Sequence, residues 1–313
     1  MADDPETRTA GSGAPDAELI ETDICVIGAG SGGLSVAAGA VQMGARVVLI
    51  EGDRMGGDCL NYGCVPSKSL IAAAKQAHAM EAGAPYGVAP VRPTVDYAAA
   101  QEHVARAIQT IAPHDSQERF EGLGVTVIRA WARFVSPREV EAGGKTIRAR
   151  RFVIATGSGP MVPPIPGLDD VPYLTNETIF DLRTRPEHLI VAGGGPIGLE
   201  MAQAHARLGS RVTLVEGDRA LGREDPEAVA PVLAALRADG VEIVEGQAVE
   251  RVSGADGAIT VHTAEREIGG SHLLVAVGRE VKLERLDLGA AGVRHDRRGV
   301  AVDARLRSSN RRV

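Results

Sequence analysis

The chain contains the same pattern of residues twice, at a constant offset of 165 residues. The first copy reads DICVIGAGSGGLSVAAGAVQMGARVVLIEGDR and ends at Arg54. The second copy reads HLIVAGGGPIGLEMAQAHARLGSRVTLVEGDR and ends at Arg219. Each copy predicts a buried strand, a glycine turn, a helix and a second strand that ends in a glutamate. We therefore expect two structural units of the same design within one chain.

Glycines recur in each copy with the spacing Gly-x-Gly-x-x-Gly, between a strand and a helix. The first glycine permits a tight turn, the second lets the backbone approach a pyrophosphate, and the third lets helix and strand pack closely. Free N–H groups at the helix start favour phosphate, and the glutamate after the second strand is suited to a ribose diol. The alternative is a pair of tight turns that bind nothing. We expect two dinucleotide sites, formed by Gly28, Gly30, Gly33 and Glu51 in the first copy and by Gly193, Gly195, Gly198 and Glu216 in the second.

Both copies continue through short strands to a strand that ends in Ala-x-Gly. In the first copy RFVIATGS reaches Thr156 and Gly157, and in the second HLLVAVGR reaches Gly278. These turns would add backbone N–H groups at each dinucleotide. The short strands before them predict a small antiparallel meander in each unit. The predicted fold class is α/β, with two doubly wound parallel-sheet dinucleotide-binding domains, each with such a meander, the second inserted into the first.

The spacing of these features predicts the domain organisation of the 313 residues. Residues 1–22 are polar and predict a disordered lead-in. The first domain is expected over 23–165 with an insertion at 52–123, the second over 166–284, and a return to the first over 285–313.

Composition excludes several classes of function. The net charge is −7, with 34 basic and 41 acidic residues, which is no electrostatic footprint for nucleic acid or anionic lipid. The uncharged stretch 24–45 is rich in glycine, so a buried strand and helix explain it better than a membrane span. The first 20 residues lack the apolar core of an export signal. We expect a cytoplasmic protein without nucleic-acid or membrane partners.

Two cysteines lie close together in the insertion, in the segment GGDCLNYGCVPSK. In a regular helix Cys59 and Cys64 would be about 7.5 Å apart along the axis, beyond what a disulfide usually tolerates, which is about 7 Å between Cα atoms. A bonded pair therefore needs an irregular segment, which Gly63 and Pro66 favour. Cys64 would then lie near a helix start, where a thiolate is favoured. Two free thiols or a metal pair remain alternatives, although the eight histidines form no matching cluster and we predict no metal.

These motifs together resemble the class I pyridine nucleotide–disulfide oxidoreductases, the family of dihydrolipoamide dehydrogenase, glutathione reductase and mercuric reductase. The resemblance runs from about Asp23 to the last residue. It implies FAD in the first repeat, NAD(P)H in the second, and a redox-active disulfide between Cys59 and Cys64. Cys64 would be the cysteine nearer the flavin, and Cys59 would exchange with the substrate. Lys68 matches the family's lysine beside the flavin and Glu200 its acidic partner, a pairing that would keep the lysine charged despite burial.

The resemblance and the residues leave the electron acceptor open. Glu216 favours the free ribose diol of NAD(H) over the 2′-phosphate of NADP(H). The expected substrate is a small disulfide or dithiol, or Hg(II). One alternative is a nucleotide-binding fragment without catalysis. Another is a flavoprotein reductase that uses quinone, oxygen or a second pyridine nucleotide.

The chain departs from the family pattern at two places. Asp58 stands where a threonine is usual before the first cysteine, and Tyr62 stands where valine is frequent. The sequence ends at SSNRRV, ahead of the family's last flavin-binding strand and its interface domain. We therefore expect a truncated chain, with a homodimer formed by the full-length parent.

Overall fold

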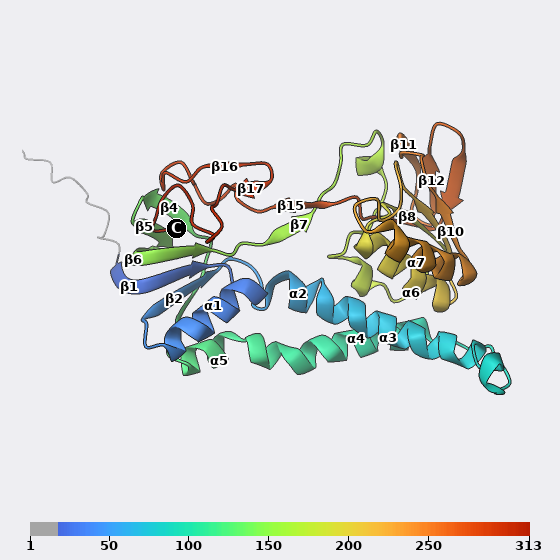
Figure 1. Ribbon diagram of the computed structural model, residues 1–313, viewed down its shortest axis with the longest axis horizontal. Helices are drawn as coiled ribbons and strands as arrows, with labels where there is room; N and C mark the ends of the chain where they lie inside the picture. The colour runs from blue at the N-terminus through green and yellow to red at the C-terminus, as the bar shows by residue number, and fades with distance from the viewer. Residues whose placement is uncertain (1–17) are drawn as a thin grey trace, which may run out of the picture.

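A computed structural model describes residues 18–313. They form two α/β lobes that lie along the long axis of the molecule, each containing one copy of the repeat (Figure 1). Strands β7 (Ser158–Pro160) and β15 (Arg279–Val281) carry the chain between the lobes and pair antiparallel with each other. Helices α3 (Cys64–Glu81) and α4 (Tyr97–Ile111) run along the opposite side and reach beneath the second lobe.

The first lobe contains a six-stranded sheet in the order β3-β2-β1-β6-β5-β4. β1 pairs parallel with β2 and β6, and the antiparallel strands β5 and β4 continue the same sheet. Successive residues of β1 face opposite sides. Val26 packs with the helix that follows the glycine turn, and Cys25 packs with the C-terminal segment. The elements are β1 (Glu18–Ile27), α1 (Ser31–Gln42), β2 (Val47–Glu51), α5 (Gln117–Gly122), β3 (Thr126–Arg129), β4 (Arg133–Ser136), β5 (Glu139–Ala142) and β6 (Lys145–Ile154).

The predicted lead-in was wrong for residues 18–22, which form the first half of β1. They pair with residues 145–149 of β6, ahead of the point where β2 joins at the other edge. Glu18 lies 2.7 Å from Lys145, and Glu21 lies 3.1 Å from Arg148. This part of the strand is an edge, so Glu18 and Glu21 face water and the stretch gives no buried-strand pattern. Residues 1–17 of the predicted lead-in lie outside the described residues.

The second lobe contains a four-stranded parallel sheet in the order β10-β9-β8-β14, with a separate antiparallel sheet of β11, β12 and β13. All five residues of β8 are buried, because helices cover one face of the sheet and the meander covers the other. The predicted fold class is confirmed, with parallel sheets and a meander in both lobes. The elements are β8 (His188–Ala192), α6 (Pro196–Arg207), β9 (Arg211–Val215), α7 (Pro226–Ala238), β10 (Val241–Val244), β11 (Arg251–Ala255), β12 (Ala258–His262), β13 (Glu267–Gly270) and β14 (His272–Val275).

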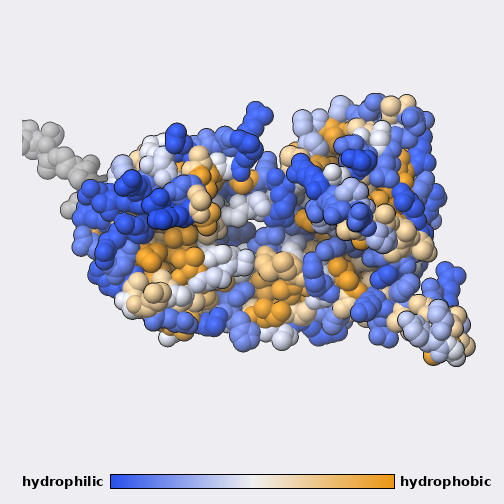
Figure 2. All heavy atoms as spheres, viewed as in Figure 1, coloured by the Kyte–Doolittle hydropathy of each residue, from blue (hydrophilic) through white to orange (hydrophobic). Residues whose placement is uncertain are grey.

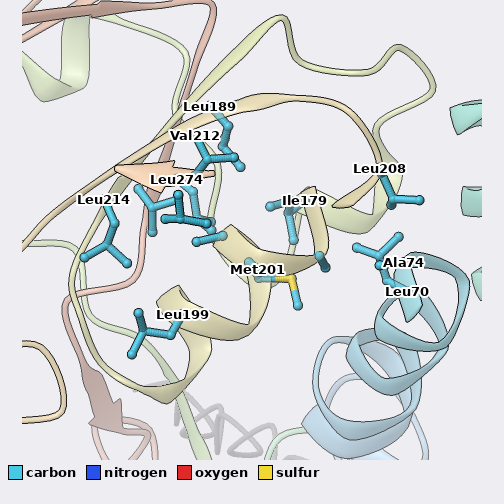
Figure 3. Packing of buried hydrophobic residues seen from close by; sticks show 14 of the residues in the cluster. Leu70, Ala74, Ile179, Leu189, Leu199, Met201, Leu208, Val212, Leu214 and Leu274 are labelled. Carbon is cyan, nitrogen blue, oxygen red and sulfur yellow. The ribbon is translucent and has the colours of Figure 1, made fainter. Parts of the chain in front are cut away.

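The insertion of the first lobe shares a hydrophobic core with the second lobe. Leu70 and Ala74 of α3 point toward Met201 and Leu208 of the α6 region (Figure 3). All four are nearly or fully buried. Tyr97, at the start of α4, belongs to the same core. The sequence predicted a helix start near Cys64, and α3 begins at that residue.

The C-terminal segment returns to the first lobe after β15 and closes one face of its sheet. The Phe134 N–H donates to the Leu286 carbonyl at 2.8 Å, and the Phe152 N–H donates to the Arg312 carbonyl at 2.7 Å. The exact domain boundaries at residues 165 and 284 stay predictions. The remaining elements are α2 (Gly57–Asn61), β16 (His295–Asp296), β17 (Gly299–Val300) and 3-10 turns at Ala84–Tyr86, Ala112–Asp115, Leu168–Asp170 and Ile179–Asp181.

Figure 2 shows a hollow between the lobes, with apolar residues gathered below it where the long helices join them. No helix among residues 18–313 is long and apolar enough to cross a membrane.

Candidate dinucleotide and dithiol site

The first and third glycines of each turn are required by the fold itself. Gly28 and Gly193 have φ of +105° and +112°, in the region that favours glycine. A β-carbon on Gly33 would collide with the carbonyl oxygen of Gly28, and one on Gly198 would collide with that of Gly193. The predicted roles of these four glycines in turn formation and close packing are therefore confirmed.

The middle glycines have no such structural reason. Gly30 has φ −80° and Gly195 has φ −76°, ordinary extended backbone for any residue. A β-carbon on Gly195 would meet no atom within 4 Å, and one on Gly30 would meet only Gly57 Cα at 3.8 Å. Both glycines are the N-cap residues of helices whose caps receive no side-chain hydrogen bond. Open space in front of free N–H groups, at the same position of both repeats, fits the phosphates of a dinucleotide.

Glu51 and Glu216 make equivalent contacts in the two lobes. The Ala29 N–H donates to Glu51 Oε2 at 2.6 Å, and the Gly194 N–H donates to Glu216 Oε2 at 2.7 Å. The other carboxylate oxygen accepts from the residue two positions on, at 2.7 Å in Glu51 and 3.0 Å in Glu216. Each glutamate thus ties its glycine turn to the end of the next strand. A carboxylate oxygen accepts more than one hydrogen bond, so capacity remains for a ribose.

A cavity of about 350 Å³ opens against the first glycine turn. Three predicted segments meet there, namely the glycine turn with Glu51, the first Ala-x-Gly turn and the start of the cysteine segment. The cysteine segment is attached directly to the turn, because the Gly56 N–H donates to the Ala29 carbonyl at 2.9 Å. The predicted residues that line the cavity are Gly28, Gly30, Glu51, Thr156 and Gly157, together with Gly57 and Asp58 of the cysteine segment.

The cysteine segment is irregular where the spacing required it. Cys59 lies in the short helix α2, Tyr62 and Gly63 break the helical path, and Cys64 is the first residue of α3. All three cysteines are free thiols, so the predicted Cys59–Cys64 disulfide is not formed in this structure. Burial, followed by a hydrogen bond with the Cys64 side chain, raises the pKa of Cys59 to about 11. Cys59 and Cys64 are thus a reduced pair, while Cys25 is fully buried in β1.

Lys68 and Glu200 pair as the resemblance implied. Lys68 Nζ lies 3.0 Å from both carboxylate oxygens of Glu200, and the contact joins α3 to α6. The expected burial was wrong, since the Lys68 side chain is 61% exposed and that of Glu200 is 36% exposed. The pair lies between the lobes rather than inside one, so water as well as the carboxylate solvates the lysine.

The second repeat differs from the first in its surroundings. A cavity of about 210 Å³ lies beside the start of α6 and is lined by Pro196 and Glu200, but not by Glu216 or the three glycines. Gly278 lies at the crossing between lobes, where its carbonyl accepts from the Met161 N–H at 3.0 Å. The structure thus gathers Cys59, Cys64, Lys68 and Glu200 around the junction of the lobes, and the second glycine turn lies at the start of α6, the same end of the helix as Glu200.

Residues 22–313 match the family described as Pyridine nucleotide-disulphide oxidoreductase. The chain belongs to this family. Mercuric reductase of Acidithiobacillus ferrooxidans is 38% identical over 305 residues, covering 93% of this chain and 54% of that protein. Mercuric reductase of Streptomyces lividans is 37% identical over 306 residues, covering 93% and 64%. The chain therefore spans between half and two thirds of these oxidoreductases.

A solved oxidoreductase of the same kind shares the fold. The HOCl-induced flavoprotein disulfide reductase RclA from Escherichia coli superposes with a TM-score of 0.81 and 29% identity, covering 93% of this chain and 64% of that one. The match extends over both lobes, because it includes nearly all of the described residues.

Several residues at the candidate site were missed by sequence reasoning. Trp131 lines the first cavity, and the Arg285 guanidinium lies 4.2 Å from its ring centroid. Arg279 Nη2 lies 2.9 Å from Asp58 Oδ1. The sequence offers weak signals for both residues, since Trp131 is the one tryptophan of the chain and Arg279 directly follows Gly278. Neither signal indicates which residue each of them contacts. Among residues 18–313, no three His, Cys, Asp or Glu side chains gather as a metal-ion site.

Proposed function

We propose that this chain carries the dinucleotide-binding and dithiol core of an FAD-dependent NAD(P)H:disulfide oxidoreductase. One observation carries the proposal: the cysteine segment is hydrogen-bonded to the first glycine turn and lines the same cavity. A dinucleotide held on that turn would lie against the segment that bears the thiols. When bound, the flavin supplies two-electron transfer between a reduced nicotinamide and the cysteine pair.

The chain's own residues would have distinct tasks in this proposal. The first turn, with Glu51, Thr156 and Gly157, would bind FAD, and the second turn, with Glu216 and Gly278, would bind the nicotinamide dinucleotide. Lys68, oriented by Glu200, would present a positive charge at the junction of the lobes. Cys64 would be the thiol nearer the flavin, and Cys59 the thiol that exchanges with substrate.

NAD(H) is proposed as the preferred dinucleotide. Glu216 and Asp218 place carboxylates at the end of β9, and the Glu216 carboxylate already accepts the Asp218 N–H. A ribose diol can donate to such a carboxylate, whereas a 2′-phosphate would be repelled by it.

The proposed substrate is a small disulfide or Hg(II), both of which react with a pair of thiols. Cys59 is half-buried and Cys64 is exposed, so the pair is reachable from outside. The mercuric reductases among the relatives support the soft-metal alternative, and RclA supports the disulfide. A homodimer and a cytoplasmic location stay predictions.

The middle glycines provide a matched test of the two-site proposal. A β-carbon at Gly30 or Gly195 strains no backbone and comes no closer than 3.8 Å to any described atom, and a valine there would extend into the space expected for phosphate. Gly30→Val should abolish FAD retention after desalting and leave NADH binding intact. Gly195→Val should do the reverse, as measured by NADH fluorescence titration. Loss of both ligands in both variants, or of neither ligand, would contradict the assignment of one dinucleotide to each turn.

A further inference from the structure

The chain between Asp58 and Cys64, here called the cysteine turn, is bridged by a buried asparagine. The Asn176 side chain, which belongs to a residue only 7% exposed, donates from Nδ2 to Asp58 Oδ1 and to the Tyr62 carbonyl, each at 3.2 Å. Asp58 immediately precedes Cys59, and Tyr62 lies two residues before Cys64. Because buried polar groups are costly to leave unpaired, this amide is held on the turn.

The Asp58 carboxylate is also held from the crossing strands. Arg279 Nη2 lies 2.9 Å from Asp58 Oδ1, and the same guanidinium donates to the Ser158 hydroxyl at 2.8 Å and to the Ser158 carbonyl at 2.7 Å. Ser158 and Arg279 begin the two paired strands β7 and β15. The guanidinium is thus fixed by one lobe-to-lobe strand pair before it meets the carboxylate, so little freedom is lost in forming the contact.

The turn closes tightly over the same carboxylate. A β-carbon on Gly63 would come within 2.9 Å of Asp58 Oδ2 and 3.3 Å of Cys59 Cα. The turn between the two cysteines therefore packs against Asp58 from within, while Asn176 and Arg279 hold it from outside.

We propose that Asp58, Asn176 and Arg279 form a clamp that positions Cys59 against Cys64 and stabilises their disulfide over the dithiol. The three are positioning residues, and the clamp rests on the proposed redox role of the pair. Holding two reacting groups together raises their effective concentration, because the entropy of bringing them together has been lost in advance. A loosened turn would let the thiols separate in the reduced form and would weaken the bond in the oxidised form.

The reaction that reports on the clamp is exchange with dithiothreitol. Cys59 and Cys64 give up two electrons and two protons and form one S–S bond. Oxidised dithiothreitol loses its S–S bond and takes up the same electrons and protons as two thiols. The equilibrium constant is obtained from thiol counts on the full chain after acid quenching, at several ratios of oxidised to reduced reagent.

Breaking the clamp should shift this equilibrium toward the dithiol. We expect Asp58→Ala, Asn176→Ala and Arg279→Met each to lower the equilibrium constant for disulfide formation by about tenfold, which is about 30 mV for a two-electron couple. Asp58→Asn keeps an oxygen acceptor and should restore most of the loss. The double variant Asp58→Ala/Arg279→Met should lose no more than Asp58→Ala alone, since both changes remove the same contact.

Glu141→Ala is the matched control, because it removes an exposed ion pair with Arg133 of 2.8 Å on the meander, far from the turn. It should leave the equilibrium constant unchanged. If Asn176→Ala fails to fold, Arg279→Met provides the test, because the Arg279 side chain is partly exposed and its loss leaves no buried amide unpaired. If the folded clamp variants keep the equilibrium constant of the unaltered protein, or if Glu141→Ala shifts it equally, the clamp is refuted and the proposed redox function is not. An unaltered protein that forms no disulfide at any ratio would overturn both the clamp and the proposed redox function.

Discussion

Lys68 Nζ lies 3.0 Å from both carboxylate oxygens of Glu200, and this ion pair joins the helix after the cysteine turn to the first helix of the second repeat. The two residues are 132 positions apart in the chain. The contact thus couples the proposed dithiol region to the lobe that would bind the nicotinamide dinucleotide.

The Lys68–Glu200 pair should matter for electron transfer more than for stability. Because both side chains are exposed, Lys68→Met and Glu200→Gln should each lower the free energy of unfolding by less than about 1 kcal/mol. Reduction of bound flavin by NADH, followed by stopped-flow absorbance, should slow by about tenfold through loss of positioning. Arg106→Gln, which breaks an exposed pair with Glu102 on α4, should change neither quantity. A purely structural pair would show the opposite result, with lower stability and an unchanged rate.

Cys59 should react slowly with alkylating reagents near neutral pH. Burial and the Cys64 side chain raise the pKa of its thiol to about 11, so at pH 8 about one molecule in a thousand carries the reactive thiolate. Labelling of Cys59 in reduced protein should therefore quicken about tenfold per pH unit between pH 8 and 10. Peptide mass spectrometry separates it from Cys25, which burial should protect until the protein unfolds. Rapid labelling of Cys59 at pH 7 would contradict this environment.

Trp131 should report on binding in the first cavity. Its indole lies against Gly52, the residue after Glu51, and it is the chain's one tryptophan. An adenine attached to a ribose on Glu51 would reach this ring, so FAD and ADP should quench the fluorescence and FMN should not. Trp131→Leu should weaken FAD binding by about tenfold, the upper end of an aromatic pair. Quenching by FMN as strong as by FAD would place the flavin, and not the adenine, at this end.

Glu216 should set the choice between the two nicotinamide dinucleotides. Glu216→Gln removes the negative charge that repels a 2′-phosphate, and should move the NADH-to-NADPH affinity ratio toward NADPH by about tenfold, the effect of losing a hydrogen bond to a charged group. Isothermal titration with each dinucleotide gives the ratio. Glu51→Gln is the control in the other repeat and should weaken FAD without altering that ratio. An unaltered protein that prefers NADPH would refute the assignment.

The protein should lose stability in mild acid through His205. Burial lowers the pKa of His205 to about 4 from 6.5, and its ring bonds the Tyr97 hydroxyl at 3.0 Å and the Met201 carbonyl at 2.8 Å. Between pH 6.5 and 4 the unfolded chain binds a proton at this residue and the folded chain does not. The unfolding free energy should therefore fall by up to about 3 kcal/mol across that window. His205→Gln should flatten the pH profile measured by urea unfolding, whereas His103→Gln, exposed on α4, should leave it intact.

Much of the fold could be predicted because its signals are local. The strand at Val47, the turn glycines and the start of the helix at Cys64 each follow from a few adjacent residues. The long first strand was missed at Glu18, since an edge strand carries no burial pattern. Partners that join distant segments were also missed. Arg279 and Asp58, or Arg285 and Trp131, come together only because two lobe-crossing strands and a returning C-terminal segment place them there.

The candidate site shows the same division. Spacing predicted which glycines the turns need, and the pairing of Lys68 with Glu200 followed from the family resemblance. Spacing could not reveal that Glu51 and Glu216 bind the N–H groups of their own turns, because the contact depends on how far each strand end curls back. Nor could it show that the lysine faces water, since exposure depends on the distance between the lobes.

The packing of α3 against α6 bears on how this protein can be dissected. Leu70 and Ala74 belong to one lobe by sequence, yet they complete the apolar interior of the other. Expressing the second lobe by itself would leave that interior uncovered, and burial of a leucine such as Leu70 is worth about 2 kcal/mol. The natural unit of denaturation, proteolysis and truncation is therefore the pair of lobes together, even though each carries its own complete sheet.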